Sequence, residues 1–74
     1  MNEFSVYQFF PNGQYECVKH FVSAEEAMKA FEYYTNSVGA RFGTTVRVII
    51  TDGGDCTNAE WVYGKGITFP TEIN

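Results

Sequence analysis

The chain has 74 residues, with nine Asp or Glu against five Lys or Arg and a formal net charge of −4 at pH 7. This length leaves room for one domain, spanning residues 1–74, and folding buries only about 60% of the surface that the unfolded chain exposes. The acidic balance and scattered basic residues argue against a nucleic-acid partner or an anionic membrane surface, because both require clustered positive charge.

The N-terminal residues form neither the basic nor the apolar segment of a signal peptide, and no apolar run is long enough to span a bilayer. We therefore expect a cytoplasmic protein with reduced thiols. The two cysteines, Cys17 and Cys56, show no CxxC or Cys/His spacing, so neither a disulfide nor a metal is expected to stabilise the fold, and no cofactor is expected. A chain of this size then depends on tight packing or on self-association.

Two segments rich in aromatic and β-branched residues, 4–10 and 15–22, flank the sequence Pro11-Asn12-Gly13. Proline presets the backbone of the first turn position, and glycine readily takes the left-handed position that follows. The pattern predicts two strands joined by a type I turn that is closed by a glycine bulge.

The register of this hairpin stays open. A bulged turn places Phe9 opposite Tyr15 and Tyr7 opposite Cys17, whereas a two-residue turn places Phe10 opposite Tyr15. A slip of one residue exchanges the two faces of a strand, so the sequence leaves open which of the two phenylalanines is buried.

The start of a helix is marked by Ser23, a good N-cap residue, and by Glu26 three positions later, which completes a capping box. The apolar stripe expected at helical spacing consists of Ala24, Ala27, Met28, Phe31, Tyr34, Val38 and Phe42. We expect the helix to end near Phe42 with Gly43 as its C-terminal cap. The alternative is an end at Gly39, since glycine is unfavourable inside a helix.

A second pair of strands is expected at residues 45–51 and 57–64, on either side of the glycine-containing turn Asp52-Gly53-Gly54-Asp55. A two-residue turn would place Arg47 directly opposite Glu60, which would form a favourable cross-strand charge pair. The remaining residues, about 65–74, are expected to be an irregular tail. Together these elements predict an α+β fold of the order β-β-α-β-β, with a four-stranded, largely antiparallel sheet and one helix packed on one face.

Catalytic residues are not expected. A thiol beside an imidazole would suggest nucleophilic catalysis, but Cys17 and His20 are three residues apart in one strand, where this spacing places side chains on opposite faces. We expect that the two cannot touch. Since His20 is the only histidine, the sequence predicts that the protein is not an enzyme.

Asp52 and Asp55 are weak candidates for a metal site. Two carboxylates flanking a tight turn could hold a hard cation such as calcium. However, the segment lacks the spacing of a calcium-binding loop, and aspartate and glycine are common in turns for local reasons. Turn formation is the favoured interpretation, and no metal is assigned.

The aromatic residues, 18% of the chain, exceed what one helix can cover on a sheet. A contiguous aromatic patch is typical of an interface. The expected interaction surface consists of Tyr7, Phe10, Tyr15, Tyr33, Trp61 and Tyr63. The sequence thus favours a non-catalytic protein-interaction module, either a homodimer or a domain that docks on another protein.

Two alternatives stay open. The first is a small-molecule or ion-binding domain that uses the aromatic face or the Asp52–Asp55 turn, and a concave pocket between helix and sheet would favour it. The second is an acidic decoy that inhibits a nucleic-acid-binding protein, and a flat surface lined by carboxylates would favour that function.

Overall fold

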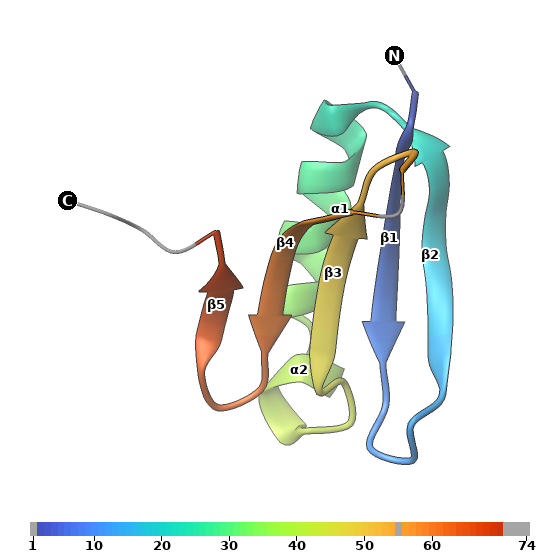
Figure 1. Ribbon diagram of the computed structural model, residues 1–74. Helices are drawn as coiled ribbons and strands as arrows, with labels where there is room; N and C mark the ends of the chain where they lie inside the picture. The colour runs from blue at the N-terminus through green and yellow to red at the C-terminus, as the bar shows by residue number, and fades with distance from the viewer. Residues whose placement is uncertain (1, 55, 71–74) are drawn as a thin grey trace, which may run out of the picture.

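The computed structural model describes residues 2–54 and 56–70. The elements in chain order are β1 (Phe4–Phe9), β2 (Tyr15–Val22), α1 (Ala24–Thr35), α2 (Val38–Phe42), β3 (Arg47–Thr51), β4 (Thr57–Val62) and β5 (Gly66–Phe69). The strands form one antiparallel sheet in the order β2-β1-β3-β4-β5 (Figure 1). The α+β class is as predicted, but the sheet has five strands rather than four, and two helices rather than one connect its halves.

The fifth strand corrects the expectation of an irregular tail at residues 65–74. Gly64 and Gly66 both have positive φ angles, 83° and 84°, which most other residues avoid. They allow the chain to reverse directly after β4, and the Lys65 amide donates to the Val62 carbonyl at 2.9 Å within this turn. Residues 71–74, the rest of the expected tail, lie outside the described residues.

The core is a small cluster of aliphatic side chains and one ring shared by α1 and the sheet. Its buried members are Val6, Ala27, Ala30, Phe31, Val48, Ile50 and Ala59. In Figure 1, α1 lies behind the central strands, consistent with its contacts to β1, β2 and β3. Since successive residues of a strand point to opposite faces, this cluster defines one side of the sheet, called here the helix side.

The helix does not run to Phe42 as expected, and it does not end at Gly39 either. It stops at Thr35, and a second short helix begins after Ser37. The Ser37 hydroxyl donates to the Tyr34 carbonyl at 2.9 Å and accepts from the Ala40 amide at 3.2 Å, so one side chain serves both helix ends. Gly43 does form the predicted left-handed cap, but it ends α2 rather than one long helix.

This break overturns part of the expected apolar stripe. Val38 and Phe42 are 71% and 78% exposed, because α2 starts a new helix and the periodicity counted from α1 no longer applies. Met28 is also exposed, at 51%, whereas Ala30, which the stripe omitted, is buried.

The first hairpin has the register of the bulged turn. Phe9 lies opposite Tyr15 and Tyr7 opposite Cys17. Gly13 has a φ angle of 88°, as the left-handed turn position requires.

The second hairpin has a different register from the predicted one. Glu60 lies opposite Ile49 rather than Arg47, because the turn is longer than two residues: the Asp52 amide donates to the Cys56 carbonyl at 3.0 Å. The Asp52 carboxylate stabilises this longer turn by accepting from the amides of Gly54 and Cys56 at 2.9 and 3.1 Å.

The left-handed glycines provide a test of this fold. Gly13 and Gly43 both have φ angles above 80°, so replacing either by alanine should cost about 1–2 kcal/mol of folding free energy. A Cβ at Gly43 would also approach the Tyr63 ring to 3.2 Å, whereas one at Gly13 meets nothing within 4 Å. We expect Gly43→Ala to lower the unfolding free energy in urea more than Gly13→Ala does. Equal losses would contradict the packing of Tyr63 against the end of α2.

Candidate functional site

The face of the sheet opposite the helix side, called here the open face, carries three aromatic rings, one of which contacts the other two. The Tyr15 ring centroid lies 5.9 Å from that of Tyr7 and 5.5 Å from that of Phe9. The Arg47 guanidinium carbon lies 4.8 Å from the centroid of Phe9, within the range of a cation–π interaction. Tyr7 and Phe9 reach this face because they alternate with Val6, which is buried on the helix side.

These rings form one patch rather than separate exposed residues. Tyr15, on β2, is 63% exposed and contacts both half-buried rings of β1, Tyr7 and Phe9. A contiguous cluster of this kind differs from the single exposed aromatics found on most protein surfaces. We refer to Tyr7, Phe9 and Tyr15 as the ring cluster.

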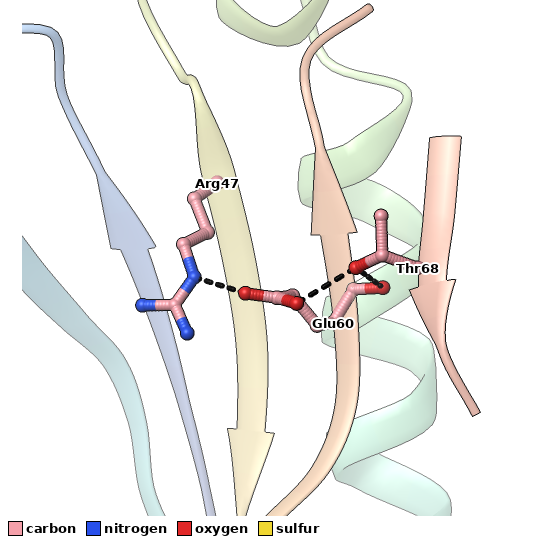
Figure 2. Close-up of polar contacts among 3 residues, drawn as sticks. All are labelled: Arg47, Glu60 and Thr68. Atoms are coloured by element: carbon pink, nitrogen blue, oxygen red, sulfur yellow. Dashed lines mark hydrogen bonds and ion pairs between the residues drawn. The ribbon is translucent and has the colours of Figure 1, made fainter. Parts of the chain in front are cut away.

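A polar network lies beside the ring cluster on the open face (Figure 2). The Glu60 carboxylate accepts a hydrogen bond from Arg47 Nε and a second one, at 2.7 Å, from Thr68 Oγ1, so it links β3, β4 and β5. The hydrogen bond from Thr68, followed by that from Arg47, lowers the pKa of the Glu60 carboxyl below its ordinary value. Arg47 and Glu60 do pair as the sequence suggested, but diagonally, because Arg47 lies opposite Val62.

Cys17 and His20 lie together on the same strand edge, contrary to expectation. Cys17 Sγ is 4.0 Å from His20 Nδ1. Tyr7 lies opposite Cys17, but Val6 lies opposite Lys19, so the ladder accommodates one extra β2 residue and the alternation of faces is interrupted. The prediction that the thiol and the imidazole cannot touch is therefore wrong.

The His20 ring is held in place by two neighbours. It stacks on the Phe21 ring, with centroids 4.0 Å apart and an interplanar angle of 27°, and its Nδ1 lies 3.4 Å from Ser5 Oγ. Ser5 is buried, and its oxygen also accepts from the Phe21 amide at 3.3 Å. Phe21 has a φ of 54°, an unusual value for an aromatic residue, at the second irregularity of the β1–β2 ladder.

The residues expected to form one interaction surface lie on two sides of the molecule. Tyr7 and Tyr15 belong to the ring cluster on the open face. Trp61 lies opposite Val48 and packs, half-buried, against the core cluster on the helix side. The Tyr63 ring lies against the backbone of Gly43 at the end of α2.

Phe10 and Tyr33 contribute instead to a groove on the helix side. This groove has a volume of about 620 Å³, and among the described residues its walls come from Gln8, Phe10, Tyr33, Tyr34, Ser37, Thr45 and neighbouring uncharged side chains. Gln8 is fixed at its floor by hydrogen bonds from Thr45 Oγ1 at 2.9 Å and to the Glu16 carboxylate at 2.8 Å. The groove is therefore aromatic, uncharged and open to solvent.

In the turn that carries the candidate cation ligand Asp52, the carboxylate of this residue accepts hydrogen bonds from the turn itself. The two amide hydrogen bonds to Asp52 satisfy one carboxylate oxygen. A side-chain hydrogen bond from Asn58, followed by the amides of Cys56 and Gly54, lowers the pKa of the Asp52 carboxyl. Asp55, the other candidate ligand, lies outside the described residues.

Two contributors to the open face, Phe9 and Arg47, were not among the predicted surface residues. Phe9 follows from strand alternation once the register of the first hairpin is known, whereas the place of Arg47 beside it depends on the pairing of β1 with β3. The proximity of Cys17 to His20 had no comparable signal, because a β-bulge leaves little trace in the residue pattern.

Comparisons of the chain with protein-family models, with curated proteins and with solved structures gave no match. Neither described helix, the longer of which has 12 residues, has the length and apolar character that crossing a membrane requires.

The network around Glu60 gives a pH-dependent prediction. A carboxyl whose pKa is lowered by folding stabilises the protein above its ordinary pKa of 4.5, and this contribution is lost as the pH falls through the lowered value. We expect Glu60→Gln to reduce the unfolding free energy at pH 7 by up to about 1 kcal/mol, since the ion pair is partly exposed. The difference in unfolding free energy between wild type and Glu60→Gln should shrink as the pH falls below 4.5.

Urea unfolding at a series of pH values measures this difference. Glu32→Gln is the matched control, because it removes a carboxylate from exposed α1 surface without touching Arg47. If the unfolding free energies of wild type and Glu60→Gln differ by the same amount down to pH 2, the proposed electrostatic contribution is contradicted.

Proposed function

We propose that this protein is a small, non-catalytic interaction module that forms a homodimer through its open face. The observation that carries the proposal is the ring cluster, in which the Tyr15 ring contacts those of Tyr7 and Phe9 while Tyr15 stays 63% exposed. Burial of such a patch releases water from apolar surface at a gain of about 25 cal/mol per Å². Tyrosine is suited to this role because its ring can be buried while its hydroxyl stays hydrated.

The dimensions of the molecule support an interface of sufficient size. Its principal extents are 34 × 32 × 19 Å, so a broad face outlines roughly 34 × 32 Å, or about 1,100 Å². A stable protein–protein interface buries about 800 Å² on each partner. The outline of the whole molecule is thus compatible with an interface of this size.

The charges on the open face also favour a second copy of this chain. Two chains of net charge −4 repel one another at long range. On the open face, however, Glu60 is paired with Arg47, so the two copies would not bring unpaired carboxylates of this network together. A face that carries both signs of charge can complement itself across a two-fold axis.

Tyr15 and Tyr33 provide a matched pair for testing the dimer. They are 63% and 69% exposed, but Tyr15 lies on the open face and Tyr33 beside the groove on the helix side. We expect Tyr15→Ser to raise the dimer dissociation constant by at least about tenfold, equivalent to about 1.4 kcal/mol, and Tyr33→Ser to leave it unchanged. Light scattering and sedimentation over a concentration series, with EDTA present, measure both constants.

Two results would argue against this proposal. One is a wild-type protein that stays monomeric at high micromolar concentration. The other is an equal effect of the two serine variants, which would place the contact elsewhere. Thermal unfolding of each variant separates loss of association from loss of folding.

A second candidate function, the binding of an uncharged small molecule, is supported by the groove on the helix side. Its aromatic walls suit a flat apolar ligand, and its volume of about 620 Å³ lies within the range of small-molecule sites. Titration with uncharged aromatic fragments should then shift the amide signals of Tyr34, Ser37 and Thr45. Fragments that shift only residues of the ring cluster would exclude the groove as their site.

The third function considered from composition, an acidic decoy, has less support. Glu60 is engaged by Arg47 and Thr68, and Glu16 accepts from the Gln8 amide. Both carboxylates already accept hydrogen bonds from side chains of the sheet, although Glu16 itself is exposed.

A further inference from the structure

We propose that Cys17 and His20 form half of a tetrahedral zinc site, which the same two residues of a second copy complete. The inference rests on the self-association proposed above and adds a metal ion to it. It starts from the contact that the β2 bulge creates between a thiol and an imidazole, the two side chains that zinc prefers as ligands.

The separation of the two ligand atoms suits zinc. With Zn–S and Zn–N bonds of about 2.3 and 2.0 Å at a tetrahedral angle, sulfur and nitrogen lie about 3.5 Å apart. Cys17 Sγ and His20 Nδ1 are 4.0 Å apart in the metal-free chain. A small rotation of either side chain closes this difference, and both residues are exposed on the edge strand of the sheet.

The surroundings of His20 orient the imidazole for ligation through Nδ1. Stacking on Phe21 fixes the plane of the ring. The Ser5 oxygen accepts from the Phe21 amide, so the Ser5 hydrogen is available to donate to Nδ1 and to favour the tautomer that carries its proton on Nε2. That tautomer leaves an unprotonated Nδ1 that can bind a metal, and zinc would replace the Ser5 hydrogen bond at this nitrogen.

The described residues of one chain supply too few ligands for a closed structural site. Among residues 2–54 and 56–70, no three histidine, cysteine or acidic side chains gather closely enough to hold an ion. A two-fold axis beside β2 would bring together two thiolates and two imidazoles, the Cys₂His₂ set of structural zinc sites. Two thiolates also neutralise the charge of Zn²⁺, so the ion would be held without adding net charge to the interface.

Zinc binding requires the thiol to lose its proton. Cys17 Sγ now donates to the Lys19 carbonyl at 3.2 Å, so the metal replaces this hydrogen bond. Each zinc ion bound by two chains displaces two thiol protons, which pass to water or buffer, and no oxidant or reductant is involved. Binding should therefore weaken as the pH is lowered.

The test adds zinc chloride to the reduced, metal-free protein in the presence of a non-chelating reductant, which prevents disulfide-linked dimers. We expect one zinc ion per two chains by calorimetry and a dimer dissociation constant lowered by at least about tenfold by light scattering. Cobalt in place of zinc should give a thiolate charge-transfer band and the visible absorption of a tetrahedral site. Cys17→Ser and His20→Ala should abolish these effects, while Cys56→Ser, which removes the other exposed cysteine, should retain them.

Three results would overturn the zinc site. They are no binding at micromolar zinc, one ion per chain without tighter association, or a loss of zinc binding in Cys56→Ser as large as in Cys17→Ser. The self-association proposal is tested separately, by comparing the dimer dissociation constants of Tyr15→Ser and Tyr33→Ser in EDTA. A dimer in EDTA that zinc does not tighten refutes the zinc site alone. A protein that is monomeric in EDTA and dimeric with zinc supports the site and refutes an interface held by the ring cluster alone.

Discussion

The limited area of one short helix is the constraint on which the rest of this structure depends. α1 runs along the strands (Figure 1), so across the sheet it covers about its own diameter of 10–12 Å, while five strands spaced about 4.8 Å apart make a sheet about 19 Å wide. The helix can therefore cover only part of one side of the sheet, and it contacts mainly β1, β2 and β3. The buried cluster accordingly contains small and aliphatic side chains and a single ring, that of Phe31. The other rings must lie at the edges, in the groove or on the open face.

The uncovered face is organised rather than merely exposed. Ile49 is only 8% exposed although its neighbours Val48 and Ile50 belong to the helix-side core. Phe9 and Arg47 stack nearby, and Glu60 connects Arg47 to β5 through Thr68. These contacts fix the side chains before any partner arrives, which lowers the entropic cost of forming an interface.

The sequence predicts the features of this fold that are local. The left-handed glycine of the first turn, the Ser23 cap and the cap at Gly43 are decided by a few neighbouring residues, and all three are present. The break at Ser37 was missed because serine within a helix is tolerated, and only its two hydrogen bonds to adjoining turns reveal a second N-cap. The register of the second hairpin was missed because Asp52 lengthens the turn through its side chain.

The candidate site is less predictable for a related reason. Alternation of faces correctly separates Tyr7 and Phe9 from Val6, so much of the ring cluster follows from the hairpin register. Strand order does not follow, because it depends on which strand edges meet in the tertiary structure. The same alternation rule fails for Cys17 and His20, since a bulge inserts one residue that a period of two cannot anticipate.

The irregular edge strand also bears on how a second copy would bind. Bulges and charged side chains such as Lys19 protect an exposed strand against continuous backbone pairing with another sheet. β2 is therefore poorly suited to extend the sheet by a regular ladder of hydrogen bonds. What the bulge provides instead is a cluster of side chains, with the thiol and imidazole brought to one side of the edge and Tyr15 nearby on the same strand. Association through these side chains would be specific to a partner that presents matching rings or metal ligands, and a second copy of this chain presents both.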